Sequence, residues 1–326
     1  MRTDIAAGRF DASKRLPSEM ELVNKYKVSR PTVARALQDL QTEGLIERRA
    51  GSGTFLRKGA SSQVPPRVRQ LGLLIPGQAT TEIFQLISGE LASLARVHDY
   101  TLLWGGSTPL QIREDVSFEH AEEICRHFIA NKVSGVFFAP CELHPEQDKV
   151  NRRLAEMLRN AGITVVLLDR DLQSFPHRSE FDLVGLDNMA SGYQIASHLL
   201  KLGCRHLYFV ARPNSAPTVE ARIAGVREVF VRHRIEPAPN WVRLGDPADL
   251  KFVRSLTAGN QADAFICAND HTAALLMRSL ESVGIQVPRN VRVVGFDDVK
   301  YATLLSVPLT TIHQPCRDID VAVQNN

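Results

Sequence analysis

The sequence lacks a long apolar run, and its first residues lack the features of a secretion signal. No apolar stretch approaches the roughly eighteen residues that indicate a membrane-spanning helix. The N-terminal segment MRTDIAAGRF contains no apolar centre of the kind that a signal peptide needs. These absences predict a protein that stays in the cytoplasm and does not bind a membrane.

Cysteine is scarce, and its spacing excludes the usual sulfur chemistry. The five cysteines, Cys125, Cys141, Cys204, Cys267 and Cys316, include no Cys-x-x-Cys pair. Cys267 lies inside an apolar run. The pattern therefore predicts reduced thiols that pack in the interior, with neither disulfides nor a metal site.

Catalytic signatures are missing as well. The histidines His98, His120, His127, His144 and His271 belong to no motif that links them to a nucleophile or a metal. The Gly51-Ser52-Gly53 run lacks the third glycine of a dinucleotide-binding loop and lies in a predicted hairpin. We therefore predict no catalytic residue and no cofactor, with an enzyme of the α/β class as an alternative.

The charge of the chain is distributed unevenly. Of 326 residues, 44% are hydrophobic and 23% charged, which is typical of a globular protein with two or three domains. The net charge of +3 combines two opposite parts: residues 1–69 contain 14 Lys and Arg against 7 Asp and Glu, and residues 70–326 contain 25 against 29. The N-terminal part thus has the charge expected of a polyanion-binding domain.

Residues 16–42 have the pattern of two short helices joined by a tight turn. Ser18 and Glu21 have the spacing of a capping box, which predicts that a helix begins at Ser18. Lys27 and Val28 form the turn, and Ser29 caps the second helix. The predicted inward face of that helix is Val33, Ala36, Leu37 and Leu40, and its outward face is Arg30, Thr32, Arg35 and Gln38. The outward face is therefore cationic and rich in hydrogen-bonding groups.

A hairpin is predicted to follow the second helix. Two strand-like runs, 44–46 and 54–56, flank a glycine-rich tip at 51–53. Arg48 and Arg49 are expected at the base of this tip.

This stretch resembles the winged helix-turn-helix of the GntR family of bacterial transcription regulators. The resemblance rests on Leu16-Pro17-Ser18-Glu19, Val28-Ser29-Arg30-Pro31-Thr32-Val33, Ala36-Leu37, Leu40, Glu43-Gly44-Leu45-Ile46 and Gly51-Ser52-Gly53-Thr54-Phe55. It implies binding to double-stranded operator DNA, with Arg30, Thr32 and Arg35 toward the major groove and Lys27, Arg48 and Arg49 toward phosphates. The tip residues Gly51, Ser52, Gly53 and Thr54 are expected near the backbone or minor groove, and the caps Ser18 and Ser29 complete the predicted set.

The rest of the chain predicts a second, larger domain. Residues 58–69 contain serine, glycine and paired prolines, which predicts a linker between a DNA-binding domain at 1–57 and a second domain at 70–326. From residue 71 onward, short apolar runs alternate with amphipathic stretches. This alternation predicts an α/β architecture with parallel sheets covered on both faces. The length favours two lobes, and residues 171–176 are expected to cross between them.

Polar residues follow three of the predicted strands. Asp169 follows 163–168, Asn269 and Asp270 follow 264–268, and Asp297 follows 291–296. Ligands bind outside the carboxyl ends of parallel strands, so these side chains are candidates for one binding cleft. Each residue can instead cap the next helix, and Asp270 before 271–281 has that pattern.

Residues 70–316 are similar to the effector-binding core of LacI/GalR-type regulators, which has the periplasmic-binding-protein fold. The matching motifs include Asp187-Asn188, Arg222-Ile223-Ala224-Gly225, Ala268-Asn269-Asp270, Gly295-Phe296-Asp297-Asp298 and Pro308-Leu309-Thr310-Thr311. The resemblance implies that Asp169, Arg222, Asn269 and Asp297 hydrogen-bond a small-molecule effector. Phe84 is a further candidate, which either stacks on the ligand or packs in the core. This set suits a sugar, and a phosphate-bearing or purine effector stays open.

Together the two halves resemble hybrid repressors of the arabinose-repressor type. The resemblance implies a homodimer that binds operator DNA and whose DNA affinity changes when the effector binds. A sugar-binding transport protein is the alternative for the larger domain. The family continues past the last predicted strand with a further helix and strand, so we expect this chain, which ends at Asn326, to be cut short at its C-terminus.

Overall fold

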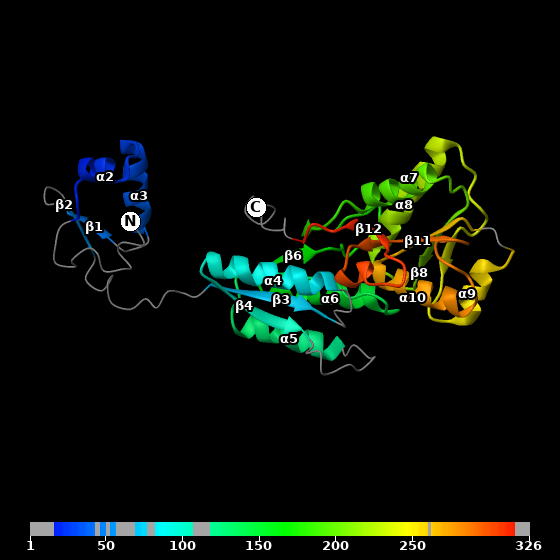
Figure 1. Ribbon diagram of the computed structural model, residues 1–326. Helices are drawn as coiled ribbons and strands as arrows, with labels where there is room; N and C mark the ends of the chain where they lie inside the picture. The colour runs from blue at the N-terminus through cyan, green and yellow to red at the C-terminus, as the bar shows by residue number, and fades with distance from the viewer. Residues whose placement is uncertain are drawn as a thin grey trace. The chain divides into compact units, whose positions relative to one another are not determined.

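The computed structural model describes residues 16–42, 46–49, 53–56, 69–76, 82–106, 118–259 and 262–316. Contacts divide the chain into two units, Met1–Val68 and Arg69–Asn326, which we call the head and the core. Figure 1 labels most of the elements of both. The predicted linker lies outside the described residues apart from Arg69, which begins a strand of the core. The expected C-terminal truncation concerns residues beyond Cys316, which also lie outside them.

The head contains two helices packed on a hairpin. Helix α2 (Glu19–Tyr26) begins after Ser18, whose hydroxyl accepts from the Glu21 amide while the Glu21 carboxylate accepts from the Ser18 amide. Helix α3 (Arg30–Thr42) follows a turn in which Lys27 has a φ of 52°. Both pack on a small core of Leu16, Leu22, Val33, Leu37, Leu40, Ile46 and Leu56. The predicted capping box is confirmed, and the predicted inward stripe of the second helix is buried except for the half-buried Ala36.

The hairpin strands differ from the predicted runs: β2 begins one residue earlier, at Gly53, and β1 extends to Arg49, past the predicted end at Ile46. Strand β1 (Ile46–Arg49) pairs antiparallel with β2 (Gly53–Leu56), and Arg49 lies opposite Gly53. Ile46 and Leu56 face each other in the small core, so pairing starts there and continues outward through both arginines. Gly53 has a φ of 113°, which only glycine adopts readily at the start of β2.

The described part of the core contains two five-stranded sheets in which all neighbouring strands are parallel. The first has the order β4 (Tyr100–Gly106), β3 (Arg69–Ile75), β5 (Gly135–Phe138), β6 (Thr164–Leu168) and β7 (Asp182–Val184). The second has the order β12 (Thr310–His313), β11 (Arg292–Asp297), β10 (Ala264–Cys267), β8 (Leu207–Ala211) and β9 (Val242–Leu244). The predicted architecture is confirmed. The edge strands β7 and β9 are short and partly exposed, so they lack the apolar runs that predict the central strands.

Helices cover these sheets and complete two lobes (Figure 1). The first lobe joins the first sheet to α4 (Glu82–Val97), α5 (Phe118–Ala130) and α6 (Gln147–Asn160). Helix α4 packs on the sheet face of Leu73, whereas α5 and α6 pack on the opposite face with Leu74. The second lobe joins the second sheet to α7 (Asn188–Lys201), α8 (Pro217–His233), α9 (Leu250–Thr257), α10 (Asp270–Ser282) and the short helix η1 (Lys300–Thr303).

The chain passes from the first lobe to the second later than predicted. Strands β6 and β7 are neighbours in the first sheet, so residues 171–176 connect two strands of one lobe. Asp171 closes this connection locally, because its carboxylate accepts from the amides of Gln173 and Ser179. The crossing lies instead at 185–187, between β7 and α7.

Helices α7 and α8 touch through their backbones at two glycines. A side chain at Gly192 would collide with the Arg222 carbonyl, and one at Gly225 would collide with the Met189 carbonyl. The close approach fixes the depth at which α8 holds the Arg222 side chain. Glycine is therefore required at both positions by space and not by its backbone angles.

We expect Gly225→Ala to destabilise the core strongly. The added methyl meets backbone atoms of α7 that cannot turn away, so the helices must separate, which costs about 1–3 kcal/mol or more. For a domain of this size the melting temperature should fall by about 4–10 °C. Gly89→Ala is the matched control, because Gly89 lies in α4 with open space around it and alanine favours the helix. Equal melting temperatures for the two variants would contradict the close helix contact.

Candidate functional sites

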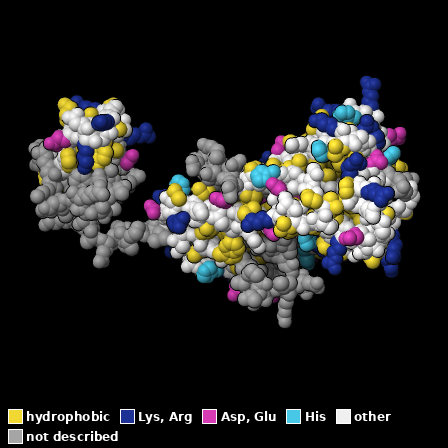
Figure 2. Space-filling view, in the orientation of Figure 1, with side chains coloured by type: hydrophobic (Ala, Val, Ile, Leu, Met, Phe, Trp, Pro, Cys, Tyr) yellow, Lys and Arg dark blue, Asp and Glu magenta, His cyan; other side chains and the backbone are white. Residues whose placement is uncertain are grey.

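The outward face of α3 is exposed over its first turns. Arg30, Thr32 and Arg35 are all exposed, and the Arg30 side chain is 75% accessible. Ser29 holds the start of the helix, because its hydroxyl lies 2.7 Å from the Thr32 hydroxyl and accepts from the Thr32 amide at 3.4 Å. Figure 2 shows Lys and Arg side chains projecting from the described part of the head. This face therefore presents guanidinium groups to solvent.

Glu19 connects α3 to the hairpin. One of its carboxylate oxygens lies 3.1 Å from Nη2 of Arg48, and the other lies 3.7 Å from Nε of Arg30. Ion pairs this exposed contribute about 0–1 kcal/mol, so a phosphate can replace the carboxylate at either arginine. The contact brings the arginines of α3 and β1, which are distant in the sequence, to one side of α2.

The other head residues of the predicted DNA-binding set fall into three groups. Lys27 is exposed at the end of α2. The Ser18 hydroxyl is occupied by the capping box, so this residue supports the helix. Gly53 and Thr54 begin β2. Gly51, Ser52 and the side chain of Arg49 lie outside the part of the chain that the structure describes.

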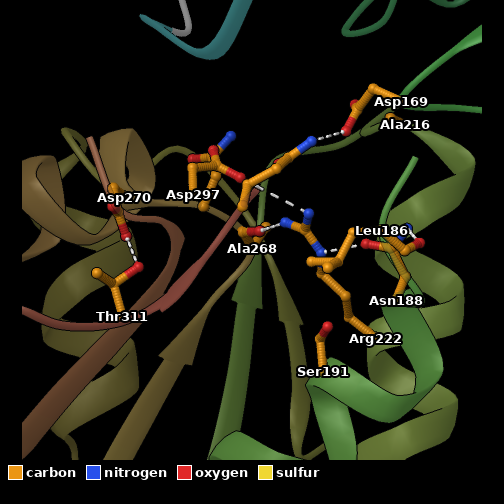
Figure 3. A network of polar contacts seen from close by, with 12 residues as sticks. Asp169, Leu186, Asn188, Ser191, Ala216, Arg222, Ala268, Asp270, Asp297 and Thr311 are labelled. Atoms are coloured by element: carbon orange, nitrogen blue, oxygen red, sulfur yellow. Dashed lines mark hydrogen bonds and ion pairs between the residues drawn. The ribbon is translucent and has the colours of Figure 1, made fainter. Parts of the chain in front are cut away.

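A second group of predicted residues meets in the core, at the carboxyl ends of the strands (Figure 3). Arg222 on α8 is its centre and is 4% exposed. Its Nε donates to Asn188 Oδ1 at 2.8 Å, its Nη1 donates to the Ala268 carbonyl, and its Nη2 lies 3.7 Å from Asp297 Oδ1. The guanidinium also lies over the Phe296 ring, 4.4 Å from its centre. The described structure thus holds every nitrogen of this guanidinium in place.

Asp169 enters the group from the end of β6 and brings two residues that the sequence did not single out. Its carboxylate accepts from Gln314 Nε2 at 2.9 Å and from Arg170 Nε at 3.2 Å. Arg170 is 5% exposed and pairs with Glu142 at 2.8 Å. Arg170 directly follows Asp169, and Gln314 follows the last strand, so their positions next to strand ends were the available signal.

Asn269 lines the cavity as expected, but it also has the capping role that was expected of Asp270. Asn269, and not Asp270, caps α10, because its Oδ1 accepts from the Thr272 amide at 2.8 Å. Asp270 is fully buried, and its carboxylate accepts from the Thr311 hydroxyl at 2.6 Å and from the Val299 amide at 3.1 Å. Asp270 therefore ties α10 to the segments around β12, and Asn269 remains at the cleft.

Phe84 does not line the cavity between these groups. It is 5% exposed and belongs to the apolar stripe by which α4 packs on the first sheet. Arg170 lies over its ring, 5.1 Å from the centre. Phe84 therefore packs in the core, which is the second of its two expected roles. Its contact with the site is through Arg170, whose guanidinium lies on its ring.

The polar side chains almost fill the space between the lobes. Asp169, Arg222, Asn269 and Asp297 all line one cavity, together with Glu142 and Arg170, but its volume is only about 20 Å³. That is room for roughly one water, whereas binding pockets for small molecules measure about 300–1,000 Å³. The lobes are therefore in a closed arrangement, and a ligand can enter only if they separate.

Burial controls the protonation of the acidic groups. It raises the pKa of Asp297 to about 8, an effect that Asp169 and Asp270 reinforce and that Arg222 opposes across 3.7 Å. Burial likewise raises the pKa of Asp270 to about 6, against the hydrogen bond from Thr311. At neutral pH the cavity thus holds a largely protonated Asp297 beside two arginines that already have acceptors.

Other chemistry finds little support within the described ranges. No group of three His, Cys, Asp or Glu side chains could hold a metal ion, and no helix is long and apolar enough to cross a membrane. The five cysteines are free and buried, as predicted, and burial raises the pKa of Cys125 to about 12 and that of Cys141 to about 11. These thiols are poor nucleophiles at neutral pH.

Comparisons with known proteins agree with both units. Residues 1–56 match the bacterial regulatory proteins of the gntR family, and residues 196–320 match the periplasmic binding protein-like domain. The chain is 27% identical to the arabinose metabolism transcriptional repressor of Geobacillus stearothermophilus, over 97% of this chain and 85% of that one. The chain therefore combines a GntR-type N-terminal domain with a periplasmic binding protein-like domain, the combination of a ligand-responsive transcription regulator.

Solved structures share the fold of this regulator. A periplasmic binding protein/LacI transcriptional regulator from Alkaliphilus metalliredigens, complexed with D-xylulofuranose, is 20% identical with a TM-score of 0.62, covering 79% of the regulator and 88% of that chain. The lac repressor dimer bound to operator and the anti-inducer ONPF is also 20% identical with a TM-score of 0.62, covering 80% and 86%. At these identities the likeness concerns the fold alone.

The stability of the regulator's core should fall as pH rises from 6.5 to about 8.5. Unfolded Asp297 has lost its proton well below this range, whereas the folded state retains it up to about pH 8, so stability is lost as pH rises through the folded pKa. Burial lowers the pKa of His271, which acts in the opposite direction only below pH 6.5. Urea unfolding followed by tryptophan fluorescence reports the core alone, because both tryptophans, Trp104 and Trp241, belong to it. A flat or rising stability over this range would contradict the raised pKa.

Proposed function

We propose that this regulator is a cytoplasmic repressor that binds a near-palindromic operator as a homodimer and releases or retains it according to a small neutral effector, most simply a sugar. The observation that carries the proposal is the presence in one chain of an exposed cationic α3 and a closed, polar cavity at the carboxyl ends of two parallel sheets. The relative named an arabinose metabolism transcriptional repressor, which aligns over nearly the whole chain, supports it.

In the proposed DNA complex, α3 lies in the major groove. Arg30, Thr32 and Arg35 point outward from its first turns and read bases or phosphates. Lys27, Arg48 and Arg49 contact phosphates, and residues 51–54 of the hairpin tip approach the backbone or minor groove. Ser18 and Ser29 act by holding the helix starts. A dimer places two such heads on successive grooves, as the two-fold symmetry of a palindrome requires.

The proposed effector site is the small cavity, opened by separation of the lobes. Asp169, Arg222, Asn269 and Asp297 face it, and we add Arg170 and Gln314 to this set. The Gln314 Oε1 atom is buried without a hydrogen-bond partner in the described part of the chain. An effector hydroxyl can donate to it, which restores a buried hydrogen bond.

The charges around the cavity favour an uncharged effector. Arg170 is already paired with Glu142 and Asp169, and Arg222 with Asn188 and the Ala268 carbonyl. A phosphate or carboxylate group would have to displace these partners and lie close to three acidic residues. Vicinal hydroxyls, in contrast, both donate and accept, so they match a mixed set of carboxylates, amides and guanidinium groups.

Binding and DNA release are linked through lobe closure. A ligand that prefers the closed lobes shifts the core toward that arrangement, and the spacing of the two heads in the dimer follows. The change in DNA affinity is limited by the ligand's differential affinity for the two states.

Two measurements on the full chain test this function. Selection from a pool of randomised DNA duplexes should recover a two-fold symmetric site, whose affinity falls steeply with salt, by roughly 0.9 log unit of K per log unit of salt for each phosphate contact. In a thermal-shift panel of pentoses, hexoses, sugar phosphates, uronic acids and purines, we expect a neutral sugar to raise the melting temperature. At a ligand concentration of a hundred times the dissociation constant, binding should add about 2.7 kcal/mol to the free energy of unfolding. Failure to enrich any duplex would refute the DNA-binding role, and a response confined to phosphates or purines would refute the effector class.

A further inference from the structure

Glu142 of the first lobe reaches across the cleft to the second lobe. Its Oε2 accepts from the Ala216 amide at 3.1 Å, and its Oε1 lies 2.8 Å from Arg170 Nη1. Ala216 is the N-cap residue of α8 and has no side-chain acceptor of its own, so the cap of this helix comes from the other lobe. The carboxylate is only 19% exposed.

The surroundings of Glu142 belong to the same interface between the lobes. The Leu143 amide donates to the Asn214 carbonyl at 2.6 Å, and Gln147 Nε2 donates to the Ser215 carbonyl at 3.5 Å. All three donor–acceptor pairs join the segment that leads into α6, up to its first residue Gln147, to the segment before α8. They can exist only while the lobes are closed.

The position of Glu142 connects the two arginines of the proposed effector site. One of its oxygens orients Arg170, which follows Asp169 at the end of β6. The other holds the first turn of α8, the helix that carries Arg222 less than two turns later. A negative charge at the start of a helix is favourable, which adds to the hydrogen bond. When the lobes close, the Glu142 carboxylate therefore acts on both arginines. It pairs with Arg170 directly, and it caps the helix that carries Arg222.

A second carboxylate makes a similar contact on another element of the first lobe. Glu82, the first residue of α4, accepts from the Lys300 amide at 3.0 Å. Lys300 follows Asp297 by three residues and begins η1. Two carboxylates of the first lobe thus accept from backbone amides of the second lobe. Glu142 does so at the start of the helix that carries Arg222, and Glu82 does so three residues after Asp297.

We propose that Glu142 is a positioning residue for effector binding, which orients Arg170 and stabilises the closed lobes by capping α8. The proposal rests on the proposed effector-binding function. The Glu142 contact with Ala216 is absent when the lobes separate, so it contributes only to the closed state and raises effector affinity by the ratio of the closed-state populations with and without it. A charge-assisted hydrogen bond changes the closing equilibrium roughly ten-fold or more, which sets the largest change in affinity that this contact alone can cause.

The first test measures lobe separation in the full chain without any ligand. Nitroxide labels at Arg152→Cys on α6 and Lys251→Cys on α9 place one probe on an exposed position of each lobe, and the five native cysteines are buried. With the labelled chain diluted in an excess of unlabelled chain, so that a dimer carries one labelled protomer, double electron–electron resonance should give one short distance for the otherwise native chain and a shift to longer distances for Glu142→Ala. Glu146→Ala is the matched control, because Glu146 is exposed in the same segment and pairs with Lys149 on its own helix. Long distances in the native chain, or none of this shift in Glu142→Ala, would overturn the proposal.

The second test measures effector affinity with L-arabinose as the probe. Glu142→Ala should weaken binding by up to roughly ten-fold in a chain that still unfolds cooperatively, whereas Glu146→Ala should leave binding unchanged. Ala216→Pro replaces the amide hydrogen with a ring carbon that excludes the Glu142 carboxylate, and its φ of −57° suits proline. The two substitutions should combine to less than the product of their separate effects, because both break the same contact. Fully multiplicative effects would overturn the proposal, and absence of L-arabinose binding to the native chain would count against the proposed effector class while the distance test still decides the role of Glu142.

Discussion

Arg30→Ala should abolish specific operator binding while effector binding and folding stay unchanged. The side chain is largely exposed at the first position of α3 and makes only a loose pair with Glu19, so its removal leaves the head core intact. A guanidinium contact to a base edge contributes about 1–3 kcal/mol. Because each dimer would carry the change twice, affinity should fall roughly thirty-fold to more than ten-thousand-fold, as measured by fluorescence anisotropy on the selected duplex.

Arg30→Lys separates base reading from attraction to phosphates. Lysine keeps the positive charge but loses the planar fork that recognises guanine, so a base-reading Arg30 predicts nearly as large a loss as for alanine with an unchanged salt slope. A phosphate contact predicts near-native affinity for Arg30→Lys and a salt slope reduced by about two, one for each head, for Arg30→Ala. Native affinity for both variants would remove α3 from the DNA interface.

Local patterns were sufficient to predict the head. The capping box at Ser18 and Glu21 involves residues three apart, and the buried stripe of α3 follows the helical period, so neither depends on distant parts of the chain. The hairpin was less predictable. Its pairing starts where Ile46, the first residue of β1, meets Leu56, the last residue of β2, a contact that sequence spacing alone does not determine.

In the polar site as well, contacts between residues far apart in the sequence could not be predicted from local patterns. Asp169, Asn269 and Asp297 could be identified because each follows an apolar run, and parallel strands end at one edge of a sheet. Glu142 and Arg170 are 28 positions apart in the sequence and meet only because β5 lies beside β6. Gln314 reaches Asp169 from the far end of the chain. The cap of α10 is Asn269 and not Asp270, because a shift of one residue at a helix start leaves the apolar pattern unchanged.

Asp297→Asn should remove the response to effector while DNA binding and folding persist. Burial raises the pKa of Asp297 to about 8, so at pH 7 the side chain is largely protonated and asparagine closely matches its size and charge. The core should therefore fold, and its loss of stability between pH 6.5 and 8.5 should disappear. Asparagine cannot ionise, however, so an effector hydroxyl that donates to the ionised form of Asp297 beside Arg222 would lose a charged acceptor, which weakens binding by about 1.5–3 kcal/mol, or roughly ten- to 150-fold.

The neighbouring residue provides the control for this variant. Asp298 is exposed and pairs with His313 at 2.8 Å, and it does not line the cavity, so Asp298→Asn makes the same chemical change just outside the site. Calorimetric titration with the sugar found in the thermal-shift panel should give native affinity for Asp298→Asn and a large loss for Asp297→Asn. Both variants should bind the selected duplex like the native chain, and only Asp297→Asn should bind it equally with and without the sugar. Unchanged sugar affinity in Asp297→Asn would mean that the buried carboxyl serves only to hold Arg222 and the end of β11 in place.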